Sequence, residues 1–209
     1  MKSLRPLLLQ GLLVLAAGGG ITGAQAGNQQ YEPLAASVQA ALHAAVADQA
    51  PLDPSFQRSP ERARWLAEMS QRLARRIPDE AYRSELLRAV HYEATRAGLD
   101  PQLVLGLIQV ESGFKKYALS TAGARGYMQV MPFWAKLIGN EESNLFHMRT
   151  NLRFGCTILR HYLDIEKGDL FRALGRYNGS LGKAEYPNLV RAAWERNWSY
   201  PANLRLAQN

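Results

Sequence analysis

One acidic side chain stands apart in the middle of the chain. Glu111 is the only acidic residue between Pro101 and Asn140, a stretch that also contains four basic residues. It ends an apolar run, and a carboxyl group at the end of an apolar helix loses hydration, which raises its pKa. A general acid needs such a pKa near neutral pH. The alternative is an ordinary glutamate that points to solvent, and its position in the sequence does not choose between the two.

The element that carries Glu111 is predicted to be a buried helix. Asp100 can cap it and Pro101 suits its first turn. The following residues, from Leu103 to Val110, place apolar side chains on nearly every side of the helix. A helix that is apolar all round belongs in the centre of a domain.

The rest of the chain also has mainly helical patterns. Before Asp100 we expect helices over residues 34–47, 61–76 and 79–98, separated by prolines. After Glu111 we expect a loop or small hairpin over residues 115–125 and a short helix over 133–138. A further helix capped by Asn151 is expected to end by Gly168, and two more helical stretches flank Tyr177-Asn178-Gly179. We find no internal repeat and no long strand pattern.

Several ordered motifs lie between about Val90 and Trp198. They are Glu111-Ser112, the run Ala122-Gly123-Ala124-Arg125-Gly126-Tyr127-Met128-Gln129 with Met131-Pro132, the segment from Asn151 to Gly155, and Tyr177-Asn178-Gly179. Together these motifs resemble the soluble lytic transglycosylase family. The dipeptide Glu-Ser alone would carry no weight. The resemblance implies a mainly α-helical, lysozyme-like domain, similar also to goose-type lysozyme, with a possible small β-hairpin and a helical extension before it.

The resemblance also implies roles for single residues. The catalytic glutamate of the family falls on Glu111. The family's substrate-binding residues fall on five further positions, which are Ser120, Gln129, Met131, Tyr177 and Asn178. Two positions depart from the family's pattern: Tyr127 stands where leucine is common, and Arg176 where a small residue usually precedes Tyr-Asn.

Each of these positions also has a structural interpretation. Met131 can fill the core, Ser120 can be a turn residue, and Asn178 with Gly179 can form a turn. The amide of Gln129, if buried, needs either a sugar or the neighbouring backbone as its partner. Tyr177 can orient Glu111 through its hydroxyl or offer its ring to a sugar, and both alternatives stay open.

The implied reaction cleaves the β-1,4 bond between N-acetylmuramic acid and N-acetylglucosamine in peptidoglycan. Glu111 would protonate the bridging oxygen and then, as a carboxylate, take the proton of the 6-hydroxyl that closes a 1,6-anhydro ring. Most glycosidases use two carboxylates, and the nearby sequence supplies one. Alternatives are a muramidase that uses water, with Asp164, Glu166 or Glu185 as a distant base, and a non-catalytic cell-wall-binding module. No cofactor or metal is expected, because the histidines, including His91, are isolated.

The N-terminus indicates export. Lys2 and Arg5 precede an apolar run, and Ala24-Gln25-Ala26 resembles a signal-peptidase site. The apolar run falls short of the roughly 20 residues that span a bilayer, so we expect no stable membrane insertion. Without residues 1–26 the net charge drops from +7 to +5, because Lys2 and Arg5 are removed and no acidic residue is. In a periplasmic protein this charge favours anionic cell-wall polymer over nucleic acid.

These patterns predict four segments: a signal peptide over 1–26, a helical extension over 27–78, a catalytic domain over 79–198 and a tail over 199–209. The extension can pack on the domain, limit access of strands to the cleft or bind a protein partner, and its residues do not decide. The single cysteine, Cys156, forms no internal disulfide and is expected to be a small buried hydrophobe.

Overall fold

The computed structural model describes residues 29–47, 56–140 and 143–200. These ranges contain eight α-helices, a short 3-10 helix, η1, and a short π-helix, η2. The elements in order are α1 (Ala36–Ala47), η1 (Phe56–Arg58), α2 (Pro60–Leu73), α3 (Glu80–Arg96), α4 (Pro101–Ser112), α5 (Pro132–Ile138), α6 (Met148–Ile165), α7 (Leu170–Asn178), α8 (Glu185–Ala193) and η2 (Trp194–Trp198). The prediction of a mainly α-helical protein is confirmed. The predicted signal peptide and residues 201–209 of the predicted tail lie outside the described residues.

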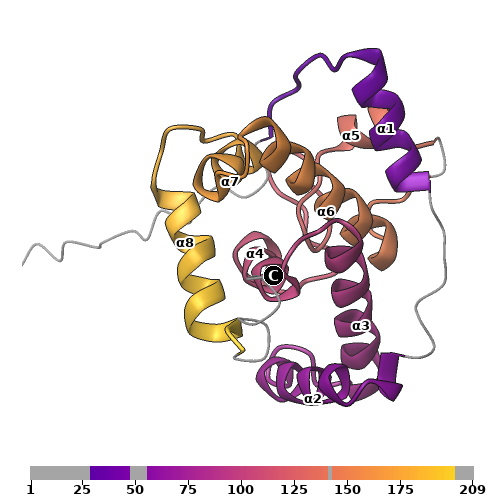
Figure 1. Cartoon of the computed structure of the whole chain (residues 1–209), viewed down its shortest axis with the longest axis vertical. Coiled ribbons are helices and arrows are strands. Elements are labelled where there is room, and N and C mark those ends of the chain that lie inside the picture. The colour runs from indigo at the N-terminus through magenta and orange to yellow at the C-terminus, as the bar shows by residue number, and fades with distance from the viewer. Residues whose placement is uncertain (1–28, 48–55, 141–142, 201–209) are drawn as a thin grey trace, which may run out of the picture.

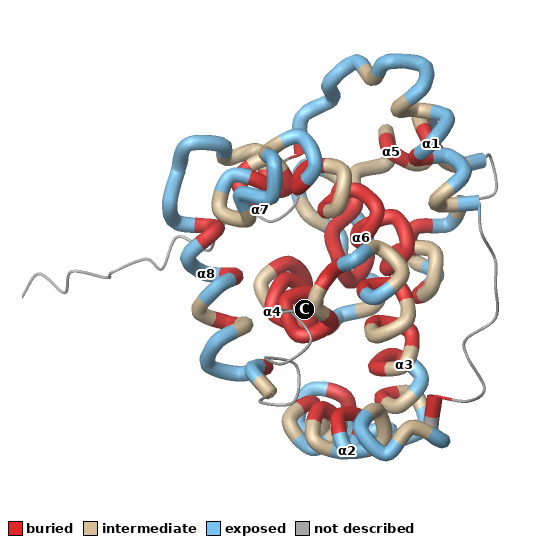
Figure 2. The backbone as a smooth tube through the Cα atoms, in the orientation of Figure 1, coloured by how far each residue is buried: buried red, intermediate tan, exposed pale blue. Residues whose placement is uncertain are grey.

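Helix α4 lies in the middle of the molecule, as its all-round apolar sequence predicts. Figure 1 shows it nearly end-on, with α2, α3, α6, α7 and α8 around it. Every residue from Pro101 to Ile108 is buried, and in Figure 2 the helix is almost entirely red. This position places the C-terminal end of α4, which carries Glu111, inside the helical ring.

Aspartates start the two helices that lead to the centre, as expected for N-caps. The side chain of Asp79 accepts a hydrogen bond from the backbone N–H of Tyr82 at 3.0 Å. That of Asp100 accepts one from Gln102 at 2.7 Å, and Gly113 ends α4 in the left-handed conformation. None of the helices in the described ranges is both long and apolar enough to cross a membrane.

The last helical segment packs closely on α4 because of a glycine. A Cβ atom added at Gly106 would lie 2.9 Å from the backbone nitrogen of Trp194, at the start of η2. A larger residue would therefore push the two backbones apart. Both α8 and η2 contact α4, so this close approach brings α8 against the helix that carries Glu111.

The predicted extension packs on the rest of the described chain through two different helices. Helix α1 contacts α5 and α6, and the side-chain amide of Gln39 donates to the carbonyl oxygen of Leu137 at 2.7 Å. Helix α2 contacts α3, where buried Arg83 donates to Ser70 Oγ at 2.8 Å and to the carbonyl oxygen of Ile77 at 2.7 Å. The boundary between extension and catalytic domain at residues 78/79 stays a prediction.

A buried ion cluster joins α3 to α6. Glu93 of α3 is fully buried and accepts hydrogen bonds from Arg153 of α6 at 2.9 and 3.3 Å and from Arg96 at 3.1 Å. A carboxylate buried in this way needs its cationic partners, because an isolated charge in the interior is strongly disfavoured. The cluster therefore fixes the relative position of two helices that surround α4.

Candidate active site

Glu111 is buried at the end of α4, with 6% of its surface exposed. Tyr186 of α8 donates a hydrogen bond to its Oε1 atom. Its Oε2 atom is buried and has no hydrogen-bond partner. A buried carboxyl oxygen without a partner is costly in a folded protein, so such groups are often functional. Glu111 thus does not point into bulk solvent.

Burial changes the acid–base character of Glu111. Loss of hydration raises the pKa of the carboxyl group to about 8, and the hydrogen bond from Tyr186 acts in the opposite direction. The group is therefore protonated at neutral pH, as a general acid must be before it donates its proton. The cause is desolvation and not repulsion from a second carboxylate.

The three acidic residues considered as a distant base are engaged elsewhere. Asp164 is exposed and pairs with Arg160 at 2.6 Å. Glu166 binds Arg172 and Arg176, which lower the pKa of its carboxyl group. Glu185 lies exposed in the first turn of α8. None of the three is among the groups that shift the pKa of Glu111.

Tyr186 is the residue that sequence reasoning missed. The pattern of α8 offers one signal, because its buried residues Tyr186, Val190 and Ala193 recur at helical spacing. That spacing predicts only that Tyr186 faces inward. Its contact with Glu111 arises from the packing of α8 on α4, which no local pattern reports.

Gln129 is buried and its amide is satisfied by the backbone. Its Nε2 atom donates to the carbonyl oxygens of Ala118 at 3.1 Å and Gly126 at 3.0 Å. Of the two partners considered for this amide, the neighbouring backbone is the one present. Gln129 thereby joins two separate positions within the loop that follows Glu111, and its contact with a sugar stays a prediction.

The loop between α4 and α5 is the element predicted as a loop or small hairpin. It contains two isolated antiparallel bridges, between Leu119 and Arg125 and between Arg125 and Val130, and no longer strand. Ser120 lies at its turn, where its hydroxyl accepts a hydrogen bond from the backbone N–H of Ala124 at 3.0 Å. The hydroxyl thus has a turn role here, and its role toward substrate stays a prediction.

Met131 and Tyr127 flank Gln129 in different environments. Met131 is half-buried at the N-terminus of α5 and packs against the core. Tyr127 is buried, and its hydroxyl lies 2.6 Å from that of Tyr82 on α3. The aromatic ring at this position therefore packs toward α3 and is not among the groups that shift the pKa of Glu111.

Tyr177 and Asn178 form the last turn of α7, and both are buried. The Tyr177 hydroxyl donates to the carbonyl oxygen of Met128 at 2.8 Å. Burial raises the pKa of the Tyr177 phenol, and the charge of the nearby Glu111 carboxylate raises it further. The hydrogen bond to Glu111 that was considered for Tyr177 is made instead by Tyr186. Binding of substrate by Tyr177 and Asn178 stays a prediction.

The segment that precedes α1 reaches the same region. Gln29 is buried, and its amide approaches the hydroxyl of Tyr177, although neither amide atom forms a hydrogen bond of ordinary geometry. Three residues further on, Glu32 pairs with Arg176 at 3.1 Å. Arg176, one of the two residues that depart from the family's pattern, thus holds the segment before α1 against α7.

Asn151 was expected to cap a helix, and this expectation is wrong. Helix α6 starts three residues earlier, with His147 at the cap position. The Asn151 side chain points out of the helix and accepts a hydrogen bond from the N–H of Met128 at 2.8 Å. Its amide donates to the carbonyl oxygens of Arg125 and Leu145, both at 2.8 Å. Asn151 therefore ties α6 to the loop that carries Gln129.

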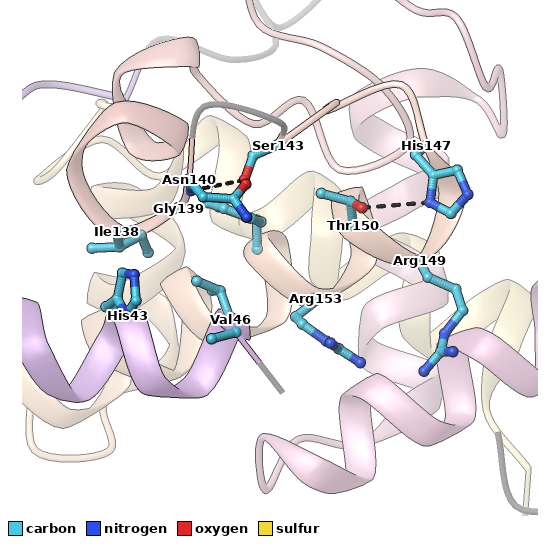
Figure 3. A pocket seen from close by; sticks show the side chains of 12 residues that line it. His43, Val46, Ile138, Gly139, Asn140, Ser143, His147, Arg149, Thr150 and Arg153 are labelled. Carbon is cyan, nitrogen blue, oxygen red and sulfur yellow. Dashed lines mark hydrogen bonds between the residues drawn. The ribbon is translucent and has the colours of Figure 1, made fainter. Parts of the chain in front are cut away.

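A separate cavity of about 410 Å³ lies between α1, the end of α5 and the start of α6. Figure 3 shows His43 of α1 opposite Arg149 and Arg153 of α6, and the hydrogen bond between Asn140 and Ser143. Glu111 does not line this cavity. Arg153 is bound to Glu93, so the cavity belongs to the ion cluster and not to the Glu111 site.

The remaining candidates for chemistry are structural. Cys156 is buried, and burial raises the pKa of its thiol. His91 lies between the rings of Phe56 and Trp65, at centroid distances of 4.9 and 5.0 Å. Burial is the main cause that lowers its pKa to about 4, so the imidazole is neutral at physiological pH.

The part of the chain that is similar to known proteins contains Glu111 and the predicted substrate-binding residues. A family model described as "Transglycosylase SLT domain" matches residues 88–193, which is half of the chain. The transglycosylase of Enterobacteria phage PRD1 is 39% identical over 88 residues, or 42% of this chain and 32% of the phage protein. The membrane-bound lytic murein transglycosylase C of Haemophilus influenzae is 43% identical in an alignment of 112 residues, which covers 46% of this chain and 31% of that protein.

The match is to a domain and not to these relatives as a whole. The chain spans about a third of the length of the two relatives. Among solved structures, an inactive mutant of the lytic transglycosylase Slt of Pseudomonas aeruginosa aligns with a TM-score of 0.42 and 19% identity, over 87% of this chain and 36% of that chain. All the positions with a predicted role, and Tyr186, fall within residues 88–193.

Proposed function

The chain belongs to the transglycosylase SLT family, and we propose that it is a lytic transglycosylase. It cleaves the β-1,4 bond between N-acetylmuramic acid and N-acetylglucosamine in peptidoglycan strands and leaves 1,6-anhydro ends. The observation that supports this proposal most strongly is the state of Glu111. This carboxyl group is buried, has one free oxygen, and is protonated at neutral pH.

A single carboxyl group suffices for this reaction because it acts twice. Protonated Glu111 donates its proton to the bridging oxygen, and the C1–O bond of the muramic acid breaks with help from the N-acetyl group. Glu111 is then a carboxylate and takes the proton from the 6-hydroxyl of the same sugar. That oxygen bonds to C1, and the enzyme returns to its protonated state without consuming water.

The nucleophile outcompetes water because it belongs to the same sugar. Well-oriented intramolecular groups reach effective molarities of about 10⁵ M or more. Orientation is the task we assign to the predicted substrate-binding residues, which are Ser120, Gln129, Met131, Tyr177 and Asn178. Tyr186 acts on the acid itself, since its hydrogen bond favours the charged form that the second step needs.

Digestion of purified sacculi tests the proposal. Mass spectrometry of the released fragments is expected to show anhydro ends, which lack the mass of one water. Fragments with reducing ends would make the protein a muramidase instead. Binding without any cleavage by the unaltered protein would make it a cell-wall-binding module. Glu111→Gln is expected to keep fold and binding but to lose turnover, because an amide cannot cycle the proton.

The site of action belongs to the same proposal. Peptidoglycan is the substrate, and the sequence of residues 1–26 supports export to the periplasm by a cleaved signal peptide. N-terminal sequencing of the protein from a periplasmic extract tests this part, with a start near Gly27 expected. An intact N-terminus would contradict it.

A further inference from the structure

One exposed patch combines aromatic rings with cations on the loop that follows Glu111. Tyr117 and Leu119 are 72% and 65% exposed, more than any other large hydrophobic side chain in the described ranges. The ring of Tyr117 lies 6.0 Å from that of Phe146, with 50° between their planes. The Tyr117 ring thus lies largely in solvent beside the half-buried ring of Phe146, just before the start of α6.

Two cations lie over these rings. The Nζ atom of Lys116 is 5.2 Å from the centre of the Tyr117 ring, and the guanidinium of Arg125 is 5.8 Å from that of Phe146. Leu119 and Arg125 are paired across an antiparallel bridge, so their positions are coupled. We call Lys116, Tyr117, Leu119, Arg125 and Phe146 the aromatic–basic patch.

The patch adjoins the predicted substrate-binding residues through the backbone. The carbonyl oxygen of Ala118, which lies between Tyr117 and Leu119, accepts a hydrogen bond from Gln129 at 3.1 Å. Ser120 follows Leu119 directly, and its hydroxyl holds the turn before Arg125. The residues expected to contact the sugar thus also fix the backbone from which the patch projects.

Stability of the fold does not account for this arrangement. A tyrosine that is 72% exposed buries little apolar area and so adds little to folding free energy. Clustered apolar groups that stay exposed usually mark a binding surface. The faces of the rings are electron-rich and attract C–H groups with partial positive charge, which cover the faces of sugar rings.

We propose that the aromatic–basic patch binds the glycan strand where it leaves the Glu111 site. Tyr117 packs against the face of a sugar ring, while Lys116 and Arg125 bind carboxylates carried by the strand or its peptides. This inference rests on the proposed function, because it takes peptidoglycan as the ligand. It assigns the ligand as an N-acetylated sugar polymer with anionic substituents.

Binding is best measured in the Glu111→Gln background, where the strand stays intact. The probes are purified sacculi in a sedimentation assay and two soluble ligands, an uncharged N-acetylglucosamine hexamer and a muropeptide tetrasaccharide with free carboxylates. Tyr117→Ala is expected to weaken binding of all three about three- to tenfold. Tyr117→Phe keeps the ring and should bind within twofold of the parent.

The charges are tested separately from the ring. Lys116→Ala with Arg125→Ala should weaken binding of sacculi and muropeptide and flatten its dependence on salt, because screening acts on the charged contacts. Binding of the uncharged hexamer should change less than twofold. If the hexamer loses as much affinity as the muropeptide, the assignment of carboxylates to these cations is wrong.

Matched controls lie at the other end of α6. This helix has 18 residues and is therefore about 27 Å long, so Ile165→Ala and Lys167→Ala remove an exposed apolar group and a charge far from Phe146. Both should bind like the parent. If Tyr117→Ala also binds like the parent, the patch is not a glycan site.

Cleavage by the same variants without the Glu111 change separates this inference from the proposed function. If Tyr117→Ala loses binding while the unaltered protein releases no anhydro ends, the result contradicts the proposed reaction and supports the patch as a glycan site. If Tyr117→Ala releases anhydro ends at the normal rate at low sacculus concentration, the result contradicts the patch as a glycan site and supports the proposed reaction. Because these side chains lie at the surface, the substitutions should change stability little. Thermal unfolding of each variant checks that it is folded.

Discussion

Tyr186 donates a hydrogen bond to Glu111 across a separation of 75 residues in the sequence. The contact is made by α8 packing on α4. It joins the group whose pKa is raised by burial to the one described side chain that acts to lower that pKa. The strength of the acid is therefore set by the position of a second helix as well as by depth in the core.

Removal of this hydroxyl should change the pH profile. In Tyr186→Phe the carboxylate loses its hydrogen bond, so the pKa of Glu111 is expected to rise above its value of about 8. The alkaline limb of kcat/KM, which reports the acid of the free enzyme, should move to higher pH, and kcat should fall about 10- to 100-fold. A profile with the same shape at a lower level would indicate a merely structural role for Tyr186.

Glu111→Gln should stabilise the protein at high pH. The folded protein holds the proton of Glu111 up to a pKa of about 8, whereas the ordinary value is 4.5. Between these values the native state binds more protons, so stability is full below about pH 4.5 and falls as pH rises through 8. Each pKa unit corresponds to about 1.4 kcal/mol, and the amide imitates the protonated acid without this loss.

Urea unfolding at about pH 5 and pH 8.5 measures this effect. The difference in unfolding free energy between Glu111→Gln and the parent should widen by up to a few kcal/mol at the higher pH. Glu61→Gln, in the exposed first turn of α2, is the control, because loss of a negative charge at a helix N-terminus brings no gain. Parallel stability curves for the parent and Glu111→Gln would contradict a raised pKa.

Asn151→Ala should loosen the loop that follows Glu111. The change removes three hydrogen bonds and leaves the buried N–H of Met128 without its partner. We expect a loss of about 3 kcal/mol in unfolding free energy, together with faster hydrogen exchange over residues 118–130. Gln71→Ala, which removes an exposed amide from α2, should change stability by less than about 0.5 kcal/mol. Equal effects of the two variants would show that Asn151 does not hold the loop.

The ion cluster between α3 and α6 predicts that Glu93→Gln strongly lowers the free energy of unfolding. The change leaves buried Arg153 without its carboxylate, which is expected to cost about 3–5 kcal/mol in thermal or urea unfolding. The double variant Glu93→Gln with Arg153→Met should lose less than the sum of the single variants. Asp164→Asn breaks the exposed pair with Arg160 and should cost at most about 1 kcal/mol. Additive losses at Glu93 and Arg153 would exclude the coupling.

The helices and the burial of α4 were predictable because their signals are local. Helix starts were predicted at Asp79 and Asp100, and both side chains cap their helices, as was expected for Asp100. The all-round apolar pattern of residues 101–110 places α4 in the core by itself, and depth in the core raises the pKa of Glu111. Capping and periodicity act within a few turns of one helix, so the amino-acid order alone reports them. The desolvation of Glu111 also needs the helices that pack around α4.

The partners of the site depend on contacts between distant segments. Asn151 was expected to cap a helix, but it forms hydrogen bonds to the loop after α4. The Tyr177 hydroxyl donates to the carbonyl oxygen of Met128, and the hydroxyl that donates to Glu111 is that of Tyr186. Each of these side chains has several suitable partners, and the chain order does not rank them. The choice among them follows from how α6, α7 and α8 pack around α4, because a hydrogen bond forms only where packing brings donor and acceptor within about 3 Å.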